Sequence, residues 1–198
     1  MTIRFNAIVA ALLLGGIPFA HPAHASDEID PFLVPAASEP SPEMARLERR
    51  HRLLQAHQII GYNTLALVTA QAALGWATFG VYKRQGLTAR WDNLRQAHLG
   101  LGLASWGSYW TGASLAIFAP KLADDAATDD DSIARHRRLA WVHGIGMGLT
   151  PVWGWLTSQK RNELLSRRNG KAYDAVAASH GIWATATAGA LIGAWLTI

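Results

Sequence analysis

Four of the eight histidines in this 198-residue chain stand alone in long stretches that contain no Asp, Glu, Lys or Arg. The four stretches are residues 53–82, 96–120, 139–159 and 175–198. Their histidines, one to each stretch, are His57, His98, His143 and His180. A neutral imidazole is a common metal ligand, and an ionisable group inside an apolar segment is a functional candidate by default. The alternative is that each histidine is a polar residue hydrogen-bonded between helices.

The position of each histidine within its stretch sorts the four into two pairs. His57 and His143 are each the fifth residue of their stretch, whereas His98 is the third and His180 the sixth of theirs. If successive stretches run in opposite directions, His57 and His143 share one level and His98 and His180 share another. Two histidines on opposed helices of a bundle can hold one haem iron from both sides. The sequence therefore predicts that these four residues are the metal ligands of two haem groups.

Residues around the histidines suit a flat, acidic macrocycle. A small side chain follows each histidine by three or four positions, on the same helix face, at Gly61, Gly102, Gly146 and Ala184. Basic residues near the histidines are candidates for binding haem propionates: Arg52 and Arg138 beside the first pair, and Arg95 and Lys171 beside the second. Anchoring at lipid headgroups explains any one of these basic residues equally well.

A weak internal repeat accompanies the histidines. The segments RRHRLLQAHQIIG (49–61) and RHRRLAWVHGIG (135–146) align His57 on His143 and Arg52 on Arg138. The chain therefore resembles two helical hairpins in tandem.

The stretches that carry the histidines are long enough to cross a membrane. They have 21 to 30 residues, and a spanning helix needs about 20. Charged residues make up only 16% of the chain, against about 25% in an ordinary soluble domain. Helices of a soluble bundle carry a polar outer face, which these stretches lack. We therefore expect an all-α fold: an integral membrane four-helix bundle with up-down-up-down topology.

The N-terminal region has the pattern of a secretory signal peptide. Arg4 precedes an apolar core, and Ala23-His24-Ala25 is an A-x-A cleavage site, so we expect residues 1–25 to be removed. An uncleaved anchor helix is the alternative. The expected organisation is then an extracytoplasmic tail at 26–50 and a four-helix transmembrane haem-binding domain at 51–198. The predicted location is a bacterial inner membrane, with the mature N-terminus in the periplasm.

Composition excludes several other classes of protein. The chain has no cysteine, which excludes disulfides, Cys-ligated zinc, iron–sulfur clusters and a thiol nucleophile. The net charge is +4 and the isoelectric point about 9.8, values that can indicate nucleic-acid binding. Under the expected topology, however, the basic excess lies in the inner loops, which argues against a nucleic-acid partner.

Two segments resemble a known family. HGIGMGLTPVWGWLTSQKR (143–161) and AHQIIGYNTLALVTAQAALGW (56–76) are similar to core helices of the cytochrome b561 family, and the resemblance covers about residues 50–198. It implies two b-type haems, each with two axial histidines, and electron transfer across the membrane. The chain departs from the family in having four helices rather than six, and Pro151 stands nearer to His143 than the family pattern has it.

The expected partners are membrane lipid and either a quinone or a periplasmic redox protein. The chain could act alone, as a homodimer or as a subunit of a larger complex, and as an electron-transfer protein or as the membrane subunit of an oxidoreductase. No catalytic residue is predicted. Two other functions stay open: a bundle that translocates protons or metal ions through its histidines, and a non-catalytic membrane scaffold.

Overall fold

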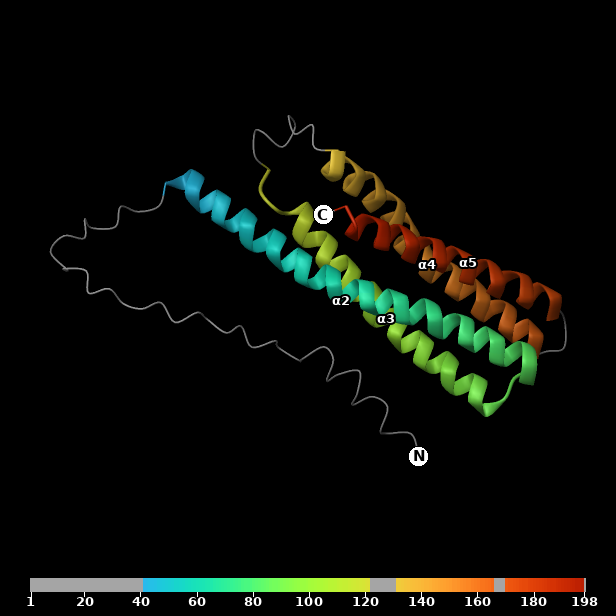
Figure 1. Cartoon of the computed structure of the whole chain (residues 1–198). Coiled ribbons are helices and arrows are strands. Elements are labelled where there is room, and N and C mark those ends of the chain that lie inside the picture. The colour runs from blue at the N-terminus through green and yellow to red at the C-terminus, as the bar shows by residue number, and fades with distance from the viewer. Residues whose placement is uncertain (1–40, 122–130, 166–169, 198) are drawn as a thin grey trace. The chain divides into compact units, whose positions relative to one another are not determined.

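The computed structural model describes residues 41–121, 131–165 and 170–197, and within these it contains four helices and no strand. The helices are α2 (Pro42–Gln85), α3 (Ala89–Ile117), α4 (Asp131–Leu165) and α5 (Gly170–Trp195) (Figure 1). The all-helical prediction is thus confirmed for the described part. The chain divides into two units, Met1–Arg46 and Leu47–Ile198. The predicted signal peptide lies outside the described residues, and the last part of the predicted tail is helical from Pro42 onward.

The helices of the unit Leu47–Ile198 pack side by side in antiparallel order (Figure 1). A side-chain contact marks each neighbouring helix pair: Thr64–Ser108 for α2 and α3, Tyr109–His143 for α3 and α4, Trp153–Trp183 for α4 and α5, and Lys83–Asp174 for α5 and α2. The two remaining pairs, α2 with α4 and α3 with α5, therefore face each other diagonally across the bundle.

A tight turn reverses the chain between α2 and α3. Gly86 ends α2 with a φ of 70°, a backbone conformation that glycine adopts without steric cost, and its N–H donates to the Tyr82 carbonyl over 2.8 Å. Thr88 then begins α3 as its N-cap, with its hydroxyl accepting from the Trp91 N–H over 3.3 Å. This turn brings the two long helices together as a hairpin.

The interior of the bundle is narrow and consists of two apolar clusters. One contains Val68, Tyr109, Met147 and Ala188, one residue from each helix. The other, near the α2–α3 turn, contains Val81, Trp91 and Tyr173. The first cluster joins all four helices, and the second joins α2, α3 and α5.

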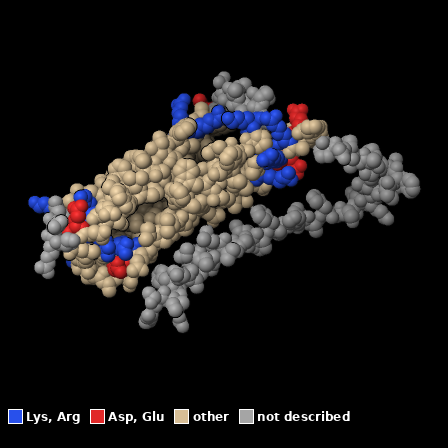
Figure 2. Space-filling model, turned by 180° about the vertical axis from the view of Figure 1, so that it is seen from behind, with Lys and Arg blue, Asp and Glu red and all other residues tan. Residues whose placement is uncertain are grey.

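The outside of the bundle is apolar over most of its length. Among many exposed apolar side chains, Trp141 on α4 is 76% exposed and Leu103 on α3 is 66% exposed. Figure 2 shows one face, on which Lys, Arg, Asp and Glu gather at the two ends of the helical body and are sparse between them. A surface of this kind is rare on a soluble monomer.

Helices α2 and α5 are each long and apolar enough to cross a membrane, by length and composition. Within their apolar windows only 22% of α2 and 11% of α5 is buried inside the protein, whereas a core helix of a soluble protein is mostly buried. By length and composition, two of the four predicted membrane spans are thus supported among the described helices, namely α2 and α5.

Candidate functional site

His98 and His180 meet across the bundle from the diagonal helices α3 and α5. Their ring centres are 6.2 Å apart and their planes are inclined by 86°. Both Nδ1 atoms are buried and have no hydrogen-bond partner among the described residues. The Nε2 atom of His98 lies 3.2 Å from the side-chain nitrogen of Gln71, whose buried amide oxygen also has no partner there. Buried polar atoms are normally paired, so this pair of rings has unused capacity to bind.

Two glycines on the other diagonal flank this pair. A Cβ added to Gly75 on α2 would lie 2.9 Å from His98 Cε1, and one added to Gly154 on α4 would lie 3.8 Å from His180 Cε1. The helices beside the two rings thus carry no side chain at these points. This allows the backbone to approach the imidazoles closely.

His57 and His143 lie on the other diagonal, on α2 and α4, and each ring is oriented by a neighbour on α3. His57 Nδ1 is 2.9 Å from the Gly112 carbonyl oxygen, to which it donates. His143 is 7% exposed, and its Nδ1 is 3.0 Å from the Tyr109 hydroxyl. An imidazole that donates a hydrogen bond from Nδ1–H has its tautomer fixed and keeps the lone pair of Nε2 for a metal. The two Nε2 atoms are therefore the ones available for binding a metal.

Helix contacts give the separation between the two pairs along the bundle. Gly154, at the level of His180, is 11 residues after His143, and Gly112, at the level of His57, is 14 residues after His98. At 1.5 Å per residue these intervals correspond to about 16 Å and about 21 Å. The two histidine pairs thus lie roughly half to two-thirds of the thickness of a bilayer's hydrocarbon core apart.

The separation of the His98 and His180 rings would allow both imidazoles to hold one haem iron between them. The bond from a metal to an imidazole nitrogen is about 2.0 Å long, and that nitrogen lies ~1 Å from the centre of its ring. Two imidazoles on opposite sides of one metal ion therefore have ring centres about 6 Å apart. The observed separation of 6.2 Å agrees with this value. Ligation through Nε2 of His98 requires the Gln71 amide to give up its contact there. Among the described residues no group of three or more His, Asp or Glu could hold a metal ion.

The prediction that glycines near the histidines leave open space holds at only one of the three positions that the structure tests. Nothing lies within 4 Å of a Cβ added to Gly61. The space beside Gly102 is filled by Gln71, whose Nε2 would lie 2.8 Å from such a Cβ, and the space beside Gly146 is filled by Thr187. The prediction of open space is therefore wrong for Gly102 and Gly146, because side chains from α2 and α5 pack against them.

The four basic residues predicted beside the histidine pairs lie at the two ends of the bundle. Arg52 is exposed and pairs with Glu48 one helical turn earlier, at 3.0 Å. Arg138 and Lys171 are exposed. Only Arg95 belongs to a larger network.

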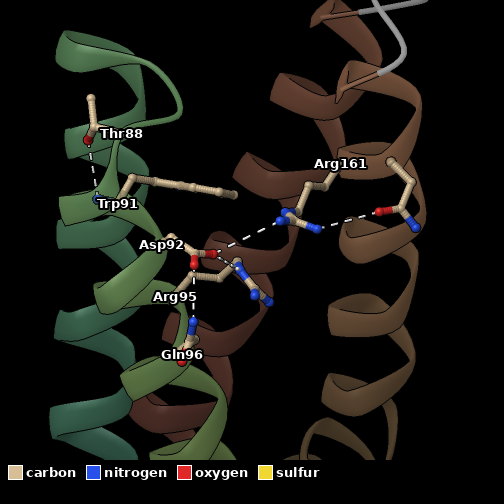
Figure 3. A network of polar contacts seen from close by, with 7 residues as sticks. Thr88, Trp91, Asp92, Arg95, Gln96 and Arg161 are labelled. Carbon is tan, nitrogen blue, oxygen red and sulfur yellow. Dashed lines mark hydrogen bonds and ion pairs between the residues drawn. The ribbon is translucent and has the colours of Figure 1, made fainter. Parts of the chain in front are cut away.

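That network joins α3 to α4 near the α2–α3 turn (Figure 3). The Arg95 Nε atom lies 3.2 Å and an Arg161 nitrogen 4.0 Å from the same oxygen of Asp92. The other Asp92 oxygen accepts from the Gln96 amide at 3.0 Å. Together with the guanidinium of Arg95, the hydrogen bond from Gln96 holds the pKa of Asp92 below its usual range.

A second ion pair closes the same end of the bundle between α2 and α5. Lys83 donates to Asp174 over 2.7 Å, and this hydrogen bond raises the pKa of Lys83. The end of the bundle next to His98 and His180 is thus tied together across both hairpins.

Several residues beside the histidines were missed in the sequence. Tyr109, Gln71, Gly75 and Gly154 are polar or small residues in apolar helices, and none of them was predicted as a site residue. Their proximity to the histidines depends on the register between helices, which cannot be read from a single sequence. Arg161 could have been found, because it is the first arginine after the third uncharged stretch.

Comparisons of the chain with family models, with curated proteins and with solved structures give no match.

Proposed function

We propose that this chain is a transmembrane di-haem cytochrome b, similar to cytochrome b561, that carries single electrons between a periplasmic partner and a quinone or a partner on the cytoplasmic side. The observation that carries the proposal is the His98–His180 pair. Its ring centres are 6.2 Å apart, and both rings have buried nitrogens without a partner among the described residues.

A membrane location for all four helices is supported by the outward-facing side chains. Helices α2 and α5 meet the length and composition expected of a span. Helices α3 and α4, which do not, also carry exposed Leu103, Ile117, Trp141 and Ile145. Contact with lipid removes these side chains from water, and a bacterial inner membrane is the location that the predicted signal peptide implies.

The proposed roles of the four histidines follow from the diagonal pairs. His57 and His143 hold one haem through Nε2, with the Gly112 carbonyl and the Tyr109 hydroxyl orienting their rings. His98 and His180 hold the other. Bound haem supplies a reversible one-electron redox centre. A haem held by two histidines would have no open position on its iron, so the protein would favour electron transfer over binding of oxygen.

The spacing of the two pairs suits electron transfer across the bilayer. They are about 16 to 21 Å apart by helix rise, within a hydrocarbon core about 30 Å thick. Each pair is therefore nearer to one membrane face, where a redox partner could dock.

An absorbance spectrum tests the proposal directly. The full chain, expressed in a bacterial host and purified in detergent, should give a reduced-minus-oxidised spectrum of b-type haem with two haems per chain. His143→Ala should lose one haem and His98→Ala the other, whereas His51→Ala, at an exposed position on α2, should keep both. A protein that binds no haem refutes the proposal and favours a proton- or metal-translocating bundle or a scaffold.

A further inference from the structure

An indole lies two helical turns from the second histidine pair, inside the bundle. Trp91 precedes His98 by seven residues on α3, and Tyr173 precedes His180 by seven residues on α5. Seven residues bring each side chain back to the same helix face about 10 Å along the axis. Trp91 is 2% exposed and packs in one cluster with Tyr173 and Val81. The cluster therefore continues the interior that holds His98 and His180.

Two buried hydrogen-bond donors at this cluster have no acceptor. Neither Trp91 Nε1 nor Arg161 Nε has a partner among the described residues. The Arg161 guanidinium carbon is 5.5 Å from the centre of a Trp91 ring. Both groups can only donate, and leaving a buried donor unpaired is costly. The missing group must therefore be a hydrogen-bond acceptor.

The charges around Trp91 indicate that this acceptor is an anion. The Arg95 guanidinium carbon also lies over the Trp91 ring, at 5.9 Å from its centre. Two guanidinium groups share the single carboxylate of Asp92, and the Arg161 contact, at 4.0 Å, is the looser (Figure 3). Arg161 also donates to the Asn162 side chain at 3.5 Å. The network thus carries one more positive charge than negative, and a guanidinium binds carboxylates well.

We propose that Trp91 Nε1 and Arg161, with Arg95 beside them, form a carboxylate-binding site for the propionate side chains of the porphyrin held by His98 and His180. This inference rests on the proposed function and adds two residues that bind the periphery of the cofactor. A lipid headgroup is disfavoured as the source of the anion because Trp91 is almost fully enclosed within the bundle.

The test compares haem with haem dimethyl ester, in which both propionates are esterified. The full chain carrying His143→Ala is used so that only the His98–His180 pair binds, and each porphyrin is titrated into haem-depleted protein in detergent. We expect about tenfold tighter binding of haem than of the ester, the preference expected of a charge-assisted hydrogen bond. Arg161→Gln and Trp91→Phe should each reduce that preference several-fold. Arg90→Gln, which removes an exposed positive charge from the start of α3, should preserve it.

The outcomes separate this inference from the proposed function. A chain that binds neither porphyrin refutes the proposed function and this site with it. A chain that binds both porphyrins equally, or whose preference survives Arg161→Gln, refutes the carboxylate site alone. Equal losses in Arg90→Gln and Arg161→Gln would mean general electrostatic attraction, which also overturns the carboxylate site. If Trp91→Phe fails to fold by circular dichroism, Arg161→Gln decides the question.

Discussion

Replacing Gly75 by alanine tests the close approach of α2 to His98. The new Cβ would lie 2.9 Å from Cε1, 3.4 Å from Nδ1 and 3.6 Å from Nε2 of that ring. Ordinary carbon contacts begin near about 3.5 Å, so the imidazole must withdraw by roughly half an ångström or rotate. A displacement of that size moves a ligand ring away from its partner across the bundle. We therefore expect Gly75→Ala to disturb the His98–His180 pair specifically.

The magnitude can be isolated with two matched glycines in the same kind of helix. Gly61→Ala meets nothing within 4 Å, and Gly154→Ala brings its Cβ only to 3.8 Å from His180. In all three variants, alanine replaces a glycine that destabilises its helix by about 0.5–1 kcal/mol relative to alanine. Only Gly75→Ala adds overpacking, which costs typically 1–3 kcal/mol. Gly75→Ala should thus be less stable than Gly61→Ala by about 1–3 kcal/mol, with Gly154→Ala close to Gly61→Ala.

Two measurements check this expectation. Unfolding in detergent, followed by circular dichroism, gives the order of stability of the three variants. The haem spectrum then reports the ligand pair, and Gly75→Ala should lower the occupancy of one haem and leave the other intact. If Gly75→Ala matches Gly61→Ala in both stability and haem content, the register of α2 against α3 is wrong.

Three further outcomes follow from single contacts. Tyr109→Phe removes the 3.0 Å hydrogen bond to His143, so it should cost about 1 kcal/mol of stability. Under the proposed function it should also speed the loss of the haem assigned to His57 and His143 to a haem-scavenging protein, and an unchanged loss rate would exclude an orienting role for Tyr109. The lowered pKa of Asp92 means that its ionised form stabilises the folded state above the unfolded pKa of about 4, and that this contribution is lost as pH falls through the folded-state pKa. Hence the melting temperatures of wild type and Asp92→Asn should converge in acid. A difference in melting temperature that persists at low pH would contradict the stabilising role of the ionised Asp92 carboxylate. Trp153→Leu removes a stacked indole pair with ring centres 5.5 Å apart and should abolish its exciton signal in circular dichroism, whereas Trp155→Leu, at a side chain 59% exposed, should retain it.

The sequence was sufficient to predict the helices and the shared level of His98 and His180, for physical reasons that are easy to identify. Long uncharged stretches must satisfy their backbone hydrogen bonds internally, which makes them helices. Counting residues from the ends of each stretch then predicts that His98 and His180 share a level, and the two rings do lie 6.2 Å apart.

The details around the rings could not be predicted because they depend on helix rotation and register. Gly102 and Gly146 follow their histidines at helical spacing, yet Gln71 and Thr187 from other helices fill the space beside them. Gly75, which was not predicted as a site residue, lies at the close approach of α2 to His98. A one-residue change in register between helices would reassign all of these contacts.

The diagonal arrangement of the histidines has a consequence for the symmetry of the fold. A twofold axis along the bundle would exchange α2 with α4 and α3 with α5, and both histidine pairs would straddle it: His57 with His143, and His98 with His180. Each hairpin supplies one member of each pair, so neither hairpin alone can complete a two-histidine site. Two identical hairpins associated about that axis, however, would create both sites at once. A gene duplication that joined such a dimer into one chain would leave the tandem segments at 49–61 and 135–146 as its trace.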